Sequence, residues 1–221
     1  MKPIFFIISL LFTIGSTIAQ TKDSTKMVKY DLSYDFNDGV FLDFPDFKNN
    51  EALPFSQTNL PSPRETDPEI ALIEEGKLEY FDQFGNKKIV SIENIWGYAY
   101  QDRIHIYYLG RFHIIPYIGS ISHFVAQVII QQNQMHDPFY DPYYRYTGPS
   151  SYTRTENLQL MLDLRTGKTY RFSHETVEVL IKTDTILYQE FMDLRKRKKK
   201  KLMFYYIRQF NEKHPVYFPH N

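Results

Sequence analysis

The stretch WGYAYQDRIHIYYLGRFHIIPYIGSISHFVAQVII, residues 96–130, decides the fold class of this chain. Residues 104–109 place apolar or aromatic side chains in both alternating sets, which is the pattern of a β-strand with both faces covered. β-branched and aromatic residues also dominate 112–117 and 123–130. Connections as short as Gln101-Asp102-Arg103 exclude parallel crossovers, so the stretch predicts an antiparallel meander.

The same pattern continues on both sides of this stretch. Upstream, strands are expected over 78–81 and 88–90, on either side of the turn Phe84-Gly85-Asn86. Gly97 lies inside a strand pattern, which indicates a bulge or a close approach of two main chains. Downstream, residues 158–163 and 168–172 predict a hairpin, closed by the turn Arg165-Thr166-Gly167.

After this hairpin, the spacing of apolar residues becomes helical. Ser173 and Asp184 are expected N-caps of two helices. A third helix, or a continuation of the second, is expected from about residue 199 to residue 212 and is stopped by His214-Pro215. We therefore expect an α+β fold, in which an antiparallel β-meander plus a hairpin is covered by C-terminal helices.

The first residues have the pattern of a secretory signal peptide. Lys2 precedes a mostly apolar run over 4–14, and Thr17 and Ala19 are small residues at the positions that a signal peptidase reads. The alternative is a membrane anchor, but the run is about half of the ~20 residues that a bilayer span needs. The protein is thus expected to be exported, either periplasmic or secreted. It has no cysteine, so it is not expected to be a lipoprotein.

Composition and charge suggest how the chain is divided. After a signal peptide over 1–19, we expect an N-terminal strand, a phenylalanine-rich turn and a proline-rich linker over 20–68. An antiparallel sheet over 69–172 follows, with an irregular insert over 131–156, and then helices over 173–221. Residues 20–75 carry a net charge of −7 and residues 183–221 a net charge of +5, so the two ends either lie near each other or meet different partners.

The segment GVFLDFPDFKNN, residues 39–50, predicts a short strand and one helical turn. Asp43 is the expected N-cap, and Phe44 and Phe47 would share a face that packs on the sheet. This segment, together with IWGY at 95–98 and FNEKHP at 210–215, resembles an uncharacterised family of exported proteins from Bacteroidetes-type bacteria. That family often has a proline directly after the asparagines, whereas three residues precede Pro54 here. The resemblance implies no activity.

Two stretches carry the candidate binding residues. The insert contains the repeated pattern DPFY and DPYY at 137–144, whose rings would stack on sugars or peptides. The alternative is a loop packed on itself. The candidate ligand-binding residues are Phe139, Tyr140, Tyr143, Tyr144 and Tyr146.

The second stretch is a run of seven basic residues. It would bind an anionic surface, or it is simply a solvated helix face or a turn between helices. Nucleic acid is not an expected partner, because an exported protein rarely meets it. The candidate residues of this run are Arg195, Lys196, Arg197, Lys198, Lys199, Lys200 and Lys201.

Patterns that indicate catalysis or metal binding are weak. His105, His113 and His123 lie on neighbouring expected strands, but no H-E-x-x-H spacing occurs, so no metal site is predicted. Asp43 and Asp46 are better explained by helix capping, and the pair at 74–75 by a solvated turn. No nucleophile elbow or phosphate-binding glycine loop is present, so we assign no catalytic residue and no cofactor.

The leading hypothesis is a non-catalytic binding or structural module of the cell envelope or the secreted fraction, whose partner is an envelope protein or glycan. One alternative is an envelope hydrolase that acts on glycan or peptide. Another is docking to an anionic surface through the basic run.

Overall fold

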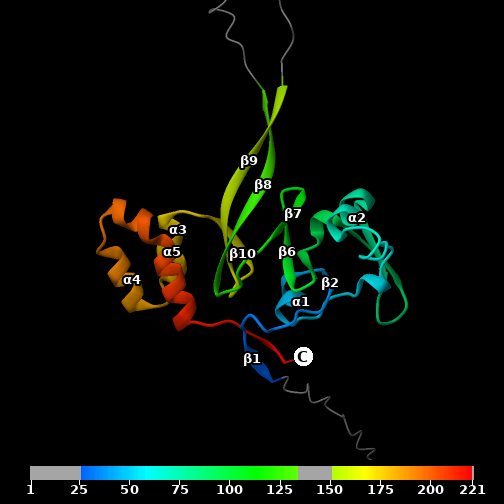
Figure 1. Cartoon of the computed structure of the whole chain (residues 1–221), viewed down its shortest axis with the longest axis horizontal. Coiled ribbons are helices and arrows are strands. Elements are labelled where there is room, and N and C mark those ends of the chain that lie inside the picture. Colours follow the sequence, from blue (N-terminus) through cyan, green and yellow to red (C-terminus); the bar gives the residue numbers. More distant parts are fainter. Residues whose placement is uncertain (1–25, 134–150, 221) are drawn as a thin grey trace, which may run out of the picture.

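The computed structural model describes residues 26–133 and 151–220, and its elements form stacked layers (Figure 1). The meander is a four-stranded antiparallel sheet in the order β2-β5-β6-β7. Its strands are Gly39–Phe41 (β2), Gly97–Tyr100 (β5), Arg103–Tyr108 (β6) and Arg111–Ile114 (β7). The expected turn regions thus lie between the strands, and β2 joins the meander at its first edge.

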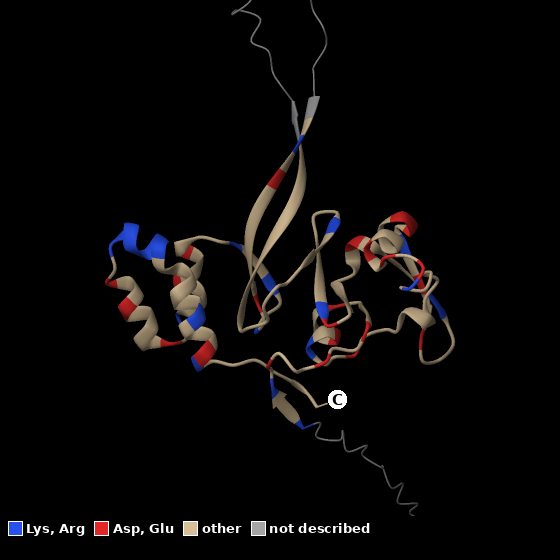
Figure 2. Cartoon of the chain, viewed as in Figure 1, with Lys and Arg blue, Asp and Glu red and all other residues tan. Residues whose placement is uncertain are grey.

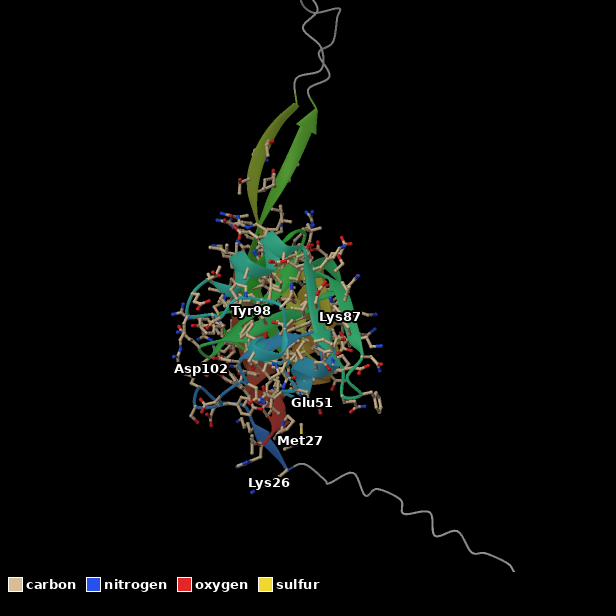
Figure 3. All side chains as sticks on the ribbon, turned by 90° about the vertical axis from the view of Figure 1, so that its right-hand side faces the viewer. Lys26, Met27, Glu51, Lys87, Tyr98 and Asp102 are labelled. Carbon is tan, nitrogen blue, oxygen red and sulfur yellow. The ribbon has the colours of Figure 1, made fainter. Side chains whose placement is uncertain are left out.

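A second antiparallel sheet has the order β10-β9-β8. Strands β8 (Ile121–Asn133) and β9 (Ser151–Asp163) pair along their whole length without a bulge, whereas β10 (Lys168–Arg171) pairs only with the last residues of β9. The outer halves of β8 and β9 therefore project from the body as a two-stranded arm, and Figure 3 shows the same projection from a view turned by 90°.

The main core lies between these two sheets. Buried side chains of β8 and β6 contribute to it, namely Phe124, Ala126, Val128, Ile104 and Ile106. Burial of this apolar surface supplies most of the driving force for folding.

The helices α3 (His174–Ile181), α4 (Thr185–Met192) and α5 (Lys196–Lys213) cover the opposite face of the second sheet. Side chains of all three helices bury Ile121 and Met161 of this sheet. Ser173 caps α3 and Asp184 caps α4, as the sequence predicts. The α+β class, with a meander and hairpin covered by C-terminal helices, is confirmed.

The two ends of the described chain meet. Strand β1 (Met27–Lys29) pairs with β11 (Tyr217–Pro219), so the N-terminal and C-terminal segments lie near each other at this point. Beside them, α1 (Phe44–Lys48) begins at Asp43, whose carboxylate accepts a hydrogen bond from the Asp46 N–H at 2.9 Å. The Phe47 ring is fully buried against the sheet, which confirms the predicted helical turn.

The outer face of the meander is covered by elements that the sequence analysis placed only in part. The hairpin of β3 (Lys77–Phe81) and β4 (Lys87–Ser91) is a separate two-stranded sheet rather than part of the meander. The sequence pattern does not predict the helix α2 (Pro68–Glu75), because the proline-rich stretch that leads into it is typical of a linker. Two short 3-10 helices, Phe55–Gln57 and Ile92–Asn94, complete this layer, and Phe55 and Leu60 of the expected linker are buried in it.

One expected boundary differs in the structure. The insert was placed at 131–156, but β8 extends to Asn133 and β9 begins at Ser151. Polar residues such as Gln131 and Thr153 continue the ladder because the pairing is made by main-chain groups, in the register that the buried part of β8 and β9 sets. No helix within 26–133 or 151–220 has the length and apolar character needed to cross a membrane.

Candidate functional site

The main chain of β8 has one edge paired with β9 and one edge that faces away. The Leu164 N–H donates to the Ser120 carbonyl at 3.0 Å. Because hydrogen-bonded pairs alternate along an antiparallel ladder, the main-chain N–H and C=O groups of even-numbered residues in this segment point toward β9. Ile121 points the other way, and the Asn211 side chain satisfies both of its main-chain groups at 2.8 Å. The Asn211 amide thus occupies the place that the peptide group of a neighbouring strand would take.

Farther along the same edge, this partner is missing. Alternation by two directs the main-chain groups of Val125, Gln127 and Ile129 outward, as at Ile121. Within the described part of the chain, β8 pairs only with β9, and no backbone hydrogen bond reaches these three residues from the open side. The edge therefore offers donors and acceptors to another extended chain.

Strand β7 lies beside this edge without pairing to it. The Ile115 N–H donates to the Ile104 carbonyl at 2.9 Å, so by alternation Phe112 and Ile114 direct their main-chain groups away from β6. A groove of about 500 Å³ lies between the two sheets. Its lining consists of Glu69, His105, Arg111, Phe112, His113, Ile114, Pro116, Val125, Gln127 and Asn157.

The composition of β8 fits an edge that takes part in binding. Its thirteen residues include no Asp, Glu, Lys, Arg or Pro. Figure 2 accordingly shows no acidic or basic residue along the described length of this strand. Val125 is 45% exposed, Ile129 63% and Ile130 37%. Natural proteins usually protect open edges with lysine, proline, bulges or a covering element. In the described part of this edge, the only such protection is the Asn211 side chain, which covers the main-chain groups of Ile121.

The three histidines do not converge on one point. The His105 ring stacks on Tyr98 with centroids 4.3 Å apart, and His113 Nε2 lies 3.1 Å from the Tyr108 carbonyl oxygen. His123 lies on the other sheet and contacts the rings of Phe172 and Phe204, which also contact each other. Among the residues that the structure describes, no three His, Asp or Glu side chains gather as metal ligands would.

Burial of these histidines predicts a loss of stability in mild acid. Desolvation lowers the pKa of His105, His113 and His123 below the ordinary value. The unfolded chain therefore binds protons more readily, so the stabilisation is complete above a pH of about 6.5 and is lost as pH falls through the folded-state pKa values.

We expect the urea midpoint of unfolding to decrease between pH 7.5 and pH 5.5. His105→Gln should make this decrease smaller because one buried proton acceptor is removed. The measurement is a set of urea titrations followed by tryptophan fluorescence. A midpoint that stays constant, or rises, as the buffer is acidified would contradict this assignment.

The structure divides the predicted basic run. Arg195 directly precedes α5, and six of the seven side chains are exposed. Lys199 is the exception: it is 8% exposed, and its Nζ lies 2.7 Å from Glu178 Oε1. Its position on the helix faces α3 and α4, and its Nζ lies 5.5 Å from the centre of the Phe191 ring. Lys199 therefore belongs to the packing between the helices, and the other six residues form the exposed part of the run.

The remaining candidates are placed as follows. The tyrosine-rich candidates over 139–146 lie outside the described residues, and the paired ends Asn133 and Ser151 put their point of attachment at the far end of the arm. Asp43 and Asp46 form the capping box of α1. The pair at 74–75 ends α2 and is not a turn, which corrects that expectation.

The groove was missed by the sequence analysis. Its two sides come from strands whose sequences look like ordinary core strands, and their separation into two sheets is a tertiary feature. One signal was present in the sequence: thirteen consecutive residues over 121–133 without a charge, in a chain that is 24% charged. That signal indicates an unprotected strand, but it does not reveal which edge is open.

The comparisons with known proteins add no relative. No protein-family model matches the chain, and neither the curated proteins nor the solved structures contain a match.

Proposed function

We propose that this is an exported, non-catalytic binding protein that takes an extended segment of a partner protein as an additional strand beside β8. One observation carries the proposal: the open edge of an uncharged strand lines a groove of about 500 Å³. Such strand addition uses main-chain hydrogen bonds for affinity and alternate side-chain contacts for specificity. Export is supported by the predicted signal peptide over 1–19.

A protein partner fits this edge better than a glycan does. Peptide groups match the spacing of the outward groups at Val125, Gln127 and Ile129, whereas sugar rings bind best on exposed aromatic faces. The exposed apolar residues of the described arm are aliphatic. We infer that the partner segment is extended and rich in β-branched residues, with little charge on the side that meets Val125.

The groove gives no support to the hydrolase alternative. Glycoside hydrolysis uses two carboxyl groups, whereas the lining of the groove contains one, that of Glu69. Its Oε1 lies 3.6 Å from Arg111 Nε in an ion pair.

A proline substitution at the open edge tests the proposal. Gln127→Pro removes an outward N–H and leaves the bonds from β8 to β9 intact, because proline is tolerated at strand edges. We expect peptides selected on the wild-type protein from a random-sequence display library to bind Gln127→Pro about two- to tenfold more weakly, as expected for one lost hydrogen bond. Binding is measured by isothermal titration calorimetry.

Thr155→Pro is the matched control because residue 155 lies opposite Ile129 on β9 and directs its N–H to the other edge of the arm. It should leave peptide binding unchanged. Equal loss in both variants, or none in either, would overturn strand addition at β8. Concentration-dependent dimers of the protein alone that Gln127→Pro abolishes would assign this edge to a second copy and overturn the proposal of a separate partner.

A further inference from the structure

The outward face of α5 combines the basic run with two exposed aromatic rings. Successive residues of an α-helix are about 100° apart, so the exposed cations of 196–201 span about 200° on the side opposite Lys199. Phe204 and Tyr205 fall within the same arc and are 50% and 54% exposed. Figure 2 shows the basic segment at one end of the helical layer.

Most of these cations make no close contact with a carboxylate, although the pKa of the exposed Glu175 carboxyl is lowered by a hydrogen bond from its own main chain and also by the charge of Lys196. Only Lys199 forms an ion pair of 4.0 Å or less among the described side chains of the run. The others lie at the positive end of the helix dipole, where cations are unfavourable, and Lys196 and Lys200 repel each other one turn apart. Arg195 supplies no side-chain cap, and the first turn contains no acidic residue.

A hollow adjoins the aromatic end of this face. It has a volume of about 450 Å³, with Phe204 and Arg208 of α5 in one wall and Tyr117 in the opposite wall. Glu212 is the one carboxylate in its lining and accepts a hydrogen bond from Gln209 Nε2 at 3.1 Å. Arg208 is exposed and makes no ion pair within the described part of the chain. The basic run and Arg208 are therefore separated by about 10 Å along the helix axis, and Arg208 lies in the lining of a hollow that also contains aromatic rings.

We propose that this face of α5 binds an acidic glycan, with sulfate or phosphate groups on the cations and a sugar ring against Phe204. The exposed cations are spread over about 200° around the helix, so one flat membrane surface cannot contact all of them. A flexible anionic chain can bend around the helix and is therefore favoured. A glycan and single-stranded nucleic acid both offer anionic groups and flat rings. We choose the glycan because the protein is expected to be exported. The hollow adjoins the first residues of β8, Ile121 and His123, whereas the groove of the open edge is lined by Val125 and Gln127 farther along the same strand.

The test measures binding to heparin as the sulfated glycan, with neutral dextran as the uncharged comparison. The triple variant Lys198→Gln, Lys200→Gln, Lys201→Gln should bind heparin at least about tenfold more weakly in about 0.15 M salt. Its slope of log affinity against log salt should decrease by about half, because each lost contact releases one counterion fewer. Phe204→Leu should weaken binding without changing this slope.

The matched control removes the same charge from the opposite layer by Lys77→Gln, Lys87→Gln and Lys88→Gln, and should retain wild-type affinity. Equal losses in the two triple variants would overturn the site. Tighter binding to phosphatidylglycerol vesicles or to polyuridylate than to heparin, at equal charge concentration, would overturn the class of ligand. Because Gln127→Pro leaves α5 unaltered, it should bind heparin normally.

Discussion

Gly97→Ala is expected to destabilise the meander strongly. A Cβ atom at this position would lie 2.1 Å from the His105 carbonyl oxygen and 3.2 Å from the Ile106 Cα, and both belong to the main chain of β6. Main-chain atoms in a paired strand cannot move aside as a flexible side chain would. We expect a loss of at least about 3 kcal/mol in the free energy of unfolding, measured by urea titration.

Gly76→Ala provides the comparison. Gly76 ends α2 at φ 63°, and no heavy atom lies within 4 Å of a Cβ built there. The cost is then limited to the left-handed conformation, about 1 kcal/mol. If the two variants were equally stable, the close approach of β5 and β6 at Gly97 would be refuted.

Phe47→Ala should be the most damaging substitution of a side chain in the main core. Phe47 is fully buried and stacks on Trp96 with centroids 4.3 Å apart. Its ring also contacts Phe41 at 5.5 Å and Phe218 at 5.4 Å, so it joins α1, the meander and β11. Truncation should cost about 3–5 kcal/mol through lost burial and a residual cavity.

Thermal unfolding of Phe47→Ala should be compared with that of Phe84→Ala. Phe84 is 77% exposed in the turn between β3 and β4. Its truncation should change stability by less than about 0.5 kcal/mol. A Phe47→Ala protein that melted within about 2 °C of wild type would show that this ring does not join the three elements.

The elements that the sequence predicted correctly depend on neighbours in the chain. Ser173 and Asp184 cap helices because their side chains reach N–H groups three residues onward. The turn at 165–167 closes a hairpin because Gly167 adopts φ 74°. Such contacts span a few residues, so the local pattern contains the information needed to place them.

The features that were missed depend on distant segments. Lys199 belongs to a run of like residues, yet it alone is buried, because α3 brings Glu178 to it. Asn211 looks like an ordinary polar helix residue, but its side chain binds both main-chain groups of Ile121, 90 positions away. Neither role has a signature in the adjacent residues.

Alternation and capping in the amino-acid sequence were enough to predict an antiparallel meander, a hairpin and terminal helices, because each depends on periods of two or 3.6 residues. Tertiary packing alone separated the strands into sheets, left the outward groups of Val125, Gln127 and Ile129 without a partner among residues 26–133 and 151–220, and oriented the cations of α5. Edges and exposed faces are defined by what lies beside them, and that is set by contacts between segments far apart in the chain.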